Sequence, residues 1–217
     1  MEIFRLAGSA ICHQATSRTL IASGQFLPLC ARCAGIYLGM LCAVVYLALR
    51  GRLLAREFPS RAALFCLLVP VALTALDASP KLLGAPEYTC NTQRFALGSA
   101  LGAAVVLSAA PAYVRLFCRA PRRGATVASA GEAALILAMS ASISMCAALF
   151  GGKASTAAGC AGVCVALIFL ALTNLAVITA LLPAFSRKRA AVLIAASLTV
   201  VQVGVASAVR WSLLSTI

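Results

Sequence analysis

The sequence predicts an all-α protein, a polytopic transmembrane helical bundle of about six spans. Of its 217 residues, 63% are apolar and only 11% are charged, whereas an ordinary soluble domain has about 45–50% apolar and about 25% charged residues. The same numbers exclude the disordered and coiled-coil classes. Six apolar runs are each long enough to cross a bilayer, which takes about 20 residues.

Polar connections between the apolar runs give the expected order of elements. Residues 1–32 are too polar to span, and they are expected to form a short interfacial Cys-His segment that folds back onto the membrane. A transmembrane bundle is expected at 33–217, where each apolar run stops at basic or turn-forming residues. The six expected spans cover about 33–49, 61–79, 95–116, 130–150, 157–182 and 190–214.

The charge pattern predicts how the bundle lies in the membrane. The formal net charge is +13, and most basic residues fall in three alternate connections, which are therefore expected in the cytoplasm, with both termini exoplasmic. A nucleic-acid partner is not expected, because no basic face is interleaved with aromatic residues. The three connections hold Arg50, Arg52, Arg56 and Arg61, then Arg115, Arg119, Arg122 and Arg123, and last Arg187, Lys188 and Arg189.

This topology places residues 1–32 and the connection 78–94 on the same, exoplasmic side, and these two segments hold most of the chemically interesting side chains. Cys30 and Cys33 form a CxxC pair, and Cys12 and His13 precede Cys30 by 18 and 17 residues. A CxxC pair lets two sulfurs approach one metal, and three Cys with one His complete a tetrahedral zinc shell. The sequence therefore predicts a metal site, with zinc ahead of iron or copper. Adjacent ligands strain a single site, so one of Cys12 and His13 is expected to support the metal without contacting it.

Two other functions stay open at this point. In a membrane thiol–disulfide oxidoreductase, Cys30 and Cys33 would form a redox disulfide, Cys12 and Cys90 a second pair, and a quinone would take the electrons. Arg32, between the two sulfurs of the CxxC, favours thiolate under either interpretation. A transporter, or a substrate-binding membrane subunit for an unknown small molecule, is the other alternative. The sequence does not decide whether the protein is an enzyme.

Asp77 is the only acid placed clearly within a span. A carboxylate at membrane depth costs about 2.5–3.5 kcal/mol on insertion scales, so Asp77 is expected to face the bundle interior and to pair with Arg94 or Arg32. The pair of Asp77 and Arg94 is either catalytic, with Asp77 as acid or base, or a structural tie between spans two and three. Asn91 is expected to be a turn or cap residue before span three.

Other residues are expected to support these two clusters. Gln14 and Arg18 follow Cys12 in the same polar segment, and Arg18, Arg32 and Arg94 are expected to balance the thiolate charge. Small residues four apart, at Gly35 and Gly39 or at Gly98 and Gly102, indicate close helix packing.

Two stretches resemble the signature of a known family, namely Cys12-His13-Gln14 and the run 27–39, LPLCARCAGIYLG. The family consists of small predicted membrane proteins of bacteria and archaea and is catalogued as a domain of unknown function. Asp77, Asn91, Arg94 and Gly98 resemble its second, looser motif. The resemblance covers about 5–110, and 111–217 is then an extension. It implies a polytopic protein of a prokaryotic cytoplasmic membrane and brings no activity with it.

Overall fold

The computed structural model describes residues 2–22, 24–82, 89–118, 120–149, 152–181 and 189–215. Over these residues the chain is mainly helical, and six helices are long and apolar enough to cross a membrane, which confirms the predicted fold class. The helices are α1 (Glu2–Ile11), α2 (Ala31–Leu49), α3 (Arg61–Leu82), α4 (Asn91–Phe117), α5 (Ala130–Leu149), α6 (Gly152–Leu181) and α7 (Arg189–Ser215), with a 3-10 turn η1 (Thr16–Arg18) after α1.

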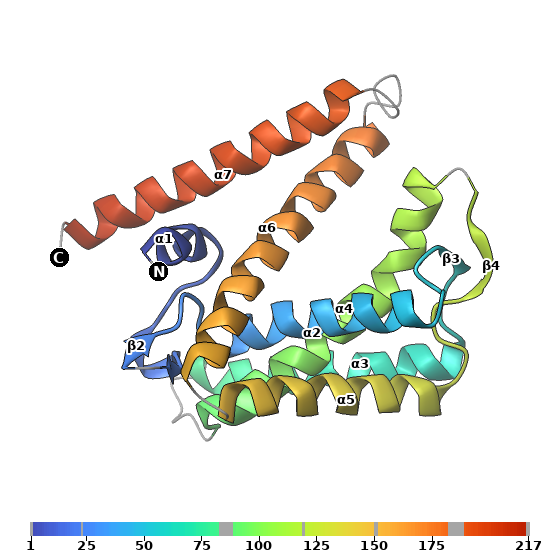
Figure 1. Cartoon of the computed structure of the whole chain (residues 1–217), viewed down its shortest axis with the longest axis horizontal. Helices are drawn as coiled ribbons and strands as arrows, with labels where there is room; N and C mark the ends of the chain where they lie inside the picture. The colour runs from blue at the N-terminus through green and yellow to red at the C-terminus, as the bar shows by residue number, and fades with distance from the viewer. Residues whose placement is uncertain are drawn as a thin grey trace.

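The helices form two groups around α2 (Figure 1). On one side, α4 and α5 pack against α2, and α3 packs against α4 and α5; on the other side, α6 crosses α2, and α7 lies outermost. The short helix α1 does not span; it lies beside α6 and α7 at the end of the bundle where α2 begins. Residues from the part that resembles the family therefore contact the extension.

Two pairs of short strands close the two ends of this arrangement. Strands β1 (Ile21–Ala22) and β2 (Gln25–Phe26) form an antiparallel hairpin within the N-terminal segment, which the sequence did not predict. Strands β3 (Ala55–Glu57) and β4 (Arg122–Ala125) pair in parallel. The second pair joins the first two basic connections at one end of the molecule, as the charge pattern predicts. Of the third connection, residues 182–188 lie outside the described residues.

Helices α2 and α4 approach so closely that neither could carry larger side chains along the contact. A Cβ atom added to Gly35 or Gly39 would overlap the carbonyl oxygen of Phe95 or Ser99 on α4. In the reverse direction, a Cβ on Gly102 would overlap the carbonyl of Ile36. Such reciprocal backbone contacts are typical of small residues spaced four apart in membrane helices. The predicted close packing is confirmed, and it fixes the first turn of α2 against α4.

A proline inside α4 is accommodated by a side chain from the neighbouring connection. Pro111 has no N–H, so the carbonyl of Leu107, four residues earlier, loses its helical partner. The Thr126 hydroxyl donates a hydrogen bond to the Leu107 oxygen at 3.0 Å, and both residues are fully buried. The connection that carries β4 therefore packs into the bundle instead of extending away from it.

Candidate metal centre

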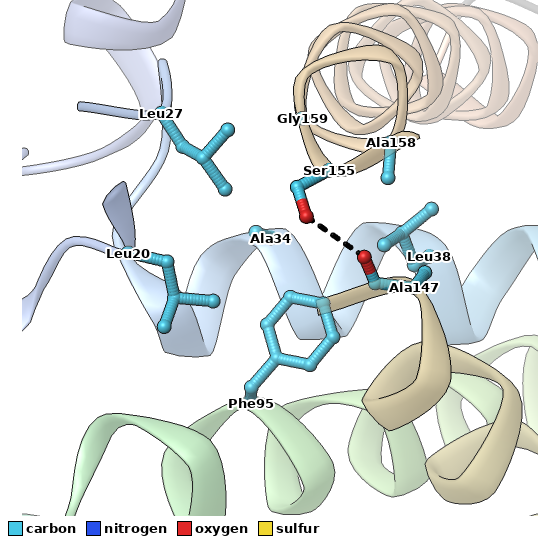
Figure 2. Close-up of a pocket in the computed structure, with 9 residues that line it drawn as sticks. All are labelled: Leu20, Leu27, Ala34, Leu38, Phe95, Ala147, Ser155, Ala158 and Gly159. Carbon is cyan, nitrogen blue, oxygen red and sulfur yellow. Dashed lines mark hydrogen bonds between the residues drawn. The ribbon is translucent and has the colours of Figure 1, made fainter. Parts of the chain in front are cut away.

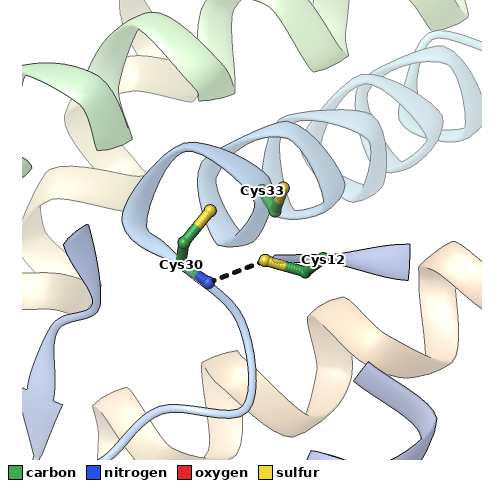
Figure 3. A group of neighbouring side chains, drawn as sticks. All are labelled: Cys12, Cys30 and Cys33. Carbon is green, nitrogen blue, oxygen red and sulfur yellow. Dashed lines mark hydrogen bonds between the residues drawn. The ribbon is translucent and has the colours of Figure 1, made fainter. Parts of the chain in front are cut away.

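Three sulfur atoms gather where the N-terminal segment meets the start of α2 (Figure 3). The Sγ atoms of Cys12, Cys30 and Cys33 all lie within 4.8 Å of one another. Cys12 directly follows α1 and is buried, whereas Cys30 and Cys33 are half-buried. Among the described residues, no other set of His, Cys, Asp or Glu side chains gathers in this way.

Local structure explains the approach of Cys30 and Cys33. Cys30 is the N-cap of α2, with extended backbone angles (φ −65°, ψ 159°), and Cys33 lies in the first helical turn. Residues three apart at a helix start lie on the same side. Leu29 and Phe95, both almost fully buried, pack in the same apolar cluster as Cys12 and hold this turn in place.

Backbone hydrogen bonds hold the Cys12 sulfur next to Cys30 and Cys33. The N–H of Cys30 donates to the Cys12 sulfur at 3.2 Å, and the N–H of Gln14 donates to the same sulfur at 3.4 Å. N–H donors aimed at a sulfur stabilise its thiolate form, which is the form that binds metals.

Gln14 connects α1 to the loop that precedes α2. Its backbone has φ +49°, in the left-handed region, and its side-chain amide donates to the carbonyls of Arg5, at 2.8 Å, and Pro28, at 2.7 Å. Gly8 lies next to this contact, and a Cβ there would overlap the Pro28 carbonyl oxygen. The amide therefore fixes where α1 ends relative to Pro28, and so where Cys12 meets Cys30.

The thiols of this group differ in pKa. Hydrogen bonds from the side chains of Cys12 and Cys33 lower the pKa of Cys30, and the nearby charge of Arg32 acts in the same direction. The hydrogen bond with the Cys30 side chain raises the pKa of Cys12, and this outweighs the opposite effect of the Cys30 backbone N–H. Cys30 is therefore the first thiol of the group to ionise, as expected for a cysteine at a helix N-terminus.

The structure places the other predicted ligand outside this group. His13 follows Cys12, but it is exposed, and its ring nitrogens are not among the gathered ligand atoms. Its role as a ligand stays a prediction. Cys90 is not part of the group either; it is exposed at the start of α4. Arg18 lies half-buried in η1.

A second polar cluster surrounds Asp77 at the same end of the bundle. The Asp77 carboxylate forms an ion pair with Arg32, accepts a hydrogen bond from the Thr89 hydroxyl, and lies 3.8 Å from Nε of Arg94. Arg94 also donates to Thr89 at 3.1 Å. The side chains of Asp77 and Arg94 are only 5% and 7% exposed. Both expected partners contact Asp77, which ties α3 to α2 and α4.

Arg32 links the two clusters. It lies on α2 between Cys30 and Cys33, and its guanidinium pairs with Asp77 on α3. Thr89, which bridges Asp77 and Arg94, was not singled out from the sequence. No local pattern distinguishes it from Thr92, because its role depends on the position of α3.

Asn91 is not the N-cap of α4; it is the first residue of the helix. The N-cap is Cys90, whose sulfur and backbone form a reciprocal capping box with Gln93, and the Cys90 N–H donates to the Gln93 side chain at 3.1 Å. Asn91 instead donates through Nδ2 to the Ser17 carbonyl at 3.1 Å. This bond joins the N-terminal segment to the start of α4. The two segments thus meet as predicted, although residues 83–88 of the connection lie outside the described residues.

A small apolar cavity (Figure 2) shares lining residues with the apolar cluster that contains Cys12. Its polar feature is Ser155, whose hydroxyl donates to the Ala147 carbonyl at 2.9 Å. Ala34, Leu38 and Phe95 line the cavity and also belong to the apolar cluster that contains Cys12. The inner side of the sulfur group is therefore apolar. The other lining residues are Leu20, Leu27, Ala158 and Gly159.

Comparisons with known proteins place this chain in a family. Residues 12–108 match a family described as predicted membrane protein (DUF2085). An uncharacterized protein of Methanocaldococcus jannaschii is 32% identical over 108 residues, 50% of this chain and 67% of the relative. An uncharacterized protein of Methanothermobacter thermautotrophicus is 33% identical over 92 residues, 42% of this chain and 78% of the relative.

No solved structure matches the chain. The matched region begins at Cys12 and includes Cys30, Cys33, Asp77 and Arg94, whereas α5, α6 and α7 lie beyond it. The chain belongs to this family of predicted membrane proteins.

Proposed function

We propose that Cys12, Cys30 and Cys33 bind a metal ion, with zinc as the preferred metal. The observation that carries this proposal is the convergence of three sulfurs from two separate segments on one point. Thiolates are soft ligands and select zinc, copper(I) or iron over magnesium and calcium. The site lies at one end of the helical bundle and not on its lipid-facing side. This position suits a metal that enters from the aqueous phase.

The spacing of the sulfurs fits a tetrahedral ion after a small adjustment. Zinc–sulfur bonds of about 2.3 Å with tetrahedral angles place sulfurs about 3.8 Å apart. The three sulfurs lie within 4.8 Å of one another, so closing around an ion requires movements of about 1 Å or less. The N–H groups of Cys30 and Gln14 already point at one of the three.

Charge balance also supports the proposal. Three thiolates with one Zn²⁺ carry a net charge of about −1. Arg32 and Arg94 together outnumber Asp77 by one positive charge at the adjoining cluster. This excess positive charge offsets the negative charge of a zinc–thiolate centre. Arg32 is the residue that adjoins both the sulfur group and the Asp77 cluster.

The fourth ligand decides whether the metal is structural or catalytic. Structural zinc sites have four protein ligands, whereas catalytic sites keep a position for water or substrate. His13 is the residue nearest in sequence to Cys12 that could supply a fourth ligand. We expect His13→Ala to lower the bound metal if the site is closed by histidine, and to leave it unchanged if the position is open.

Metal analysis of the anaerobically purified protein tests the proposal. We expect about one zinc per chain, and a loss of most of it in Cys30→Ser. Cys42→Ser is the matched control, because Cys42 lies on the same helix outside the sulfur group. A wild-type protein without stoichiometric metal contradicts the proposal, as does equal metal in the two variants.

Asp77 and Arg94 are proposed to hold α3 and α4 in place beside this centre, with an acid or base role for Asp77 as the alternative. The two arginines and Thr89 that surround the carboxylate favour the first role. Asp77→Asn keeps the shape and removes the charge, so it separates the two. A lower free energy of unfolding for Asp77→Asn, with unchanged metal content, supports the structural role.

The oxidoreductase alternative has its own signature. Thiol alkylation before and after reduction counts disulfides, and two pairs released only by reductant favour the redox function with a quinone acceptor. A single group of three thiols, protected by metal and released by a chelator, favours the metal centre. We place the centre on the exoplasmic side of the cytoplasmic membrane as part of the same proposal.

A further inference from the structure

The two basic connections are joined by β3 and β4 and lie side by side at the end of the bundle opposite the sulfurs (Figure 1). We call the described residues of 50–61 and 115–125 the arginine platform. The Arg122 N–H donates to the Leu54 carbonyl at 2.9 Å, and the Thr126 N–H donates to the Glu57 carbonyl at 3.3 Å. Backbone hydrogen bonds therefore hold the platform together as one unit.

The platform carries a large excess of positive charge. Its one arginine with a carboxylate partner among the described residues is Arg52, which binds Glu132 at 2.7 Å. Tyr46 also donates to that carboxylate, at 2.6 Å. The one carboxylate of the platform itself, Glu57, is exposed. The remaining described arginines of the platform are Arg50, Arg56, Arg61, Arg115, Arg122 and Arg123, all of them exposed.

Two of these arginines are held in fixed positions by the fold. Nε of Arg115 donates to the Arg56 carbonyl at 3.1 Å, and its guanidinium lies 4.7 Å from the centre of the Phe58 ring. Nη1 of Arg122 donates to the Gly51 carbonyl at 3.2 Å. Each guanidinium uses one donor internally and keeps the others for a ligand. An arginine held in this way loses less side-chain entropy when it binds.

Apolar side chains are exposed among the arginines of the platform. Leu53, Leu54 and Phe58 are 42%, 40% and 44% exposed. A cationic surface with apolar side chains between its charges is typical of segments that lie at the level of lipid headgroups, where the apolar groups reach the acyl chains.

We infer that the arginine platform binds the headgroup phosphates of anionic phospholipids. Guanidinium groups match phosphate oxygens with paired N–H donors, and the platform offers several of them with one exposed carboxylate beside them. Basic residues next to membrane helices attract anionic lipids with about 1 kcal/mol each, which corresponds to about fivefold in affinity. The apolar side chains make a lipid a better occupant than a soluble phosphate. This inference does not depend on the proposed metal centre.

Lipid selectivity of the full-length protein tests the inference. The purified protein is exchanged into an equimolar mixture of phosphatidylglycerol and phosphatidylcholine, and the retained lipids are counted by native mass spectrometry. We expect phosphatidylglycerol to be enriched about tenfold or more, and each of Arg115→Gln and Arg122→Gln to reduce this enrichment about three- to fivefold. Arg5→Gln is the control, because Arg5 is an exposed arginine of α1 at the other end.

A second variant covers the case in which loss of the internal hydrogen bonds unfolds the platform. The side chains of Arg50 and Arg123 form no hydrogen bond or ion pair with the described residues, so R50Q/R123Q removes charge without removing such bonds. We expect the same loss of enrichment from this pair. Equal retention of both lipids by the wild type overturns the inference. So does displacement of phosphatidylglycerol by millimolar inorganic phosphate, which would indicate a site for a soluble anion.

Discussion

Gln14 holds together the two segments that supply the sulfurs. Its amide hydrogens bind the carbonyls of Arg5 and Pro28, and its own N–H points at Cys12. It adopts a left-handed backbone conformation, which is uncommon for a residue other than glycine. The side chain and the backbone of one residue thus act together to place Cys12 beside α2.

Gln14→Gly separates these contributions. Glycine adopts the left-handed conformation without strain, so this variant removes the amide and leaves the backbone free to keep its path. We expect the zinc affinity to fall about tenfold or more, as for other residues that orient metal ligands. Competition with a chromophoric chelator measures the change. Gln25→Gly, in the exposed hairpin, should leave the affinity unchanged; equal losses in the two variants would show that Gln14 has no special role.

Cys30 should remain reactive at low pH in the metal-free protein. Because its pKa is lowered, its thiolate persists as the pH falls, whereas Cys12, with a raised pKa, is protonated. Only the thiolate reacts with iodoacetamide. Between pH 8 and pH 6 we expect the alkylation rate of Cys30 to fall less than about threefold, and that of Cys12 to fall about tenfold per pH unit. Peptide mass spectrometry measures both rates, and parallel decreases would contradict the assignment.

At the scale of elements, the close contact of α2 and α4 sets the geometry of the functional end. The contact brings the first turn of α2, with Cys30 and Cys33, beside Arg94 and Phe95 on α4. At the glycines of this contact, the backbone of one helix meets the backbone of the other directly. A shift of one helix along the other would separate Arg32 and Arg94 from the Asp77 carboxylate that they share.

Gly39→Ala should destabilise the bundle. The added methyl group would meet the Ser99 backbone, and backbone cannot move aside as a side chain can, so we expect a loss of about 2–3 kcal/mol. Gly204→Ala, on α7 where an added Cβ would meet nothing within 4 Å, is the control and should be neutral or slightly stabilising. Unfolding by sodium dodecyl sulfate in mixed micelles measures both. Equal stability of the two variants would mean that α2 and α4 do not pack through these glycines.

Across the whole molecule, polar chemistry is divided between two ends. The sulfurs and the Asp77 cluster lie at the end where α2 begins, and the arginine platform lies at the end where α2 stops. Six spanning helices with basic connections at one end match the positive-inside pattern. The metal centre would then face the exoplasm, and the platform the cytoplasmic leaflet.

Two cysteines at opposite ends of α4 test this orientation. Cys90 is exposed before α4, and Cys118 follows it. An N–H bond from Gln93 lowers the pKa of Cys90, which keeps it reactive near neutral pH. In intact cells we expect a membrane-impermeant maleimide to label Cys90 and to spare Cys118, with the reverse in inside-out vesicles. Single-cysteine variants analysed by gel shift give the result, and labelling of Cys118 in intact cells would reverse the topology.

Much of the fold follows from the sequence alone because bilayer thickness sets the length of each apolar run. The apolar runs predict the six spans, the glycine spacing predicts close packing at α2 and at α4, and the single buried acid predicts its arginine partners. Each of these depends on local composition or on the cost of burying a charge, which a sequence shows directly. Residue type and spacing also predict that Cys12 lies close to Cys30 and Cys33.

The remaining features depend on contacts between residues far apart in the chain. That Cys90 caps α4 while Asn91 reaches Ser17 depends on where the N-terminal segment lies against α4. The position of His13 outside the sulfur group depends on the turn at Gln14, and Thr89 meets Asp77 because of how α3 packs. The sequence determined which side chains reach one end of the bundle, since spans and charges order the connections. Tertiary structure decided which of them touch, because hydrogen bonds and close packing act over distances shorter than the width of one helix.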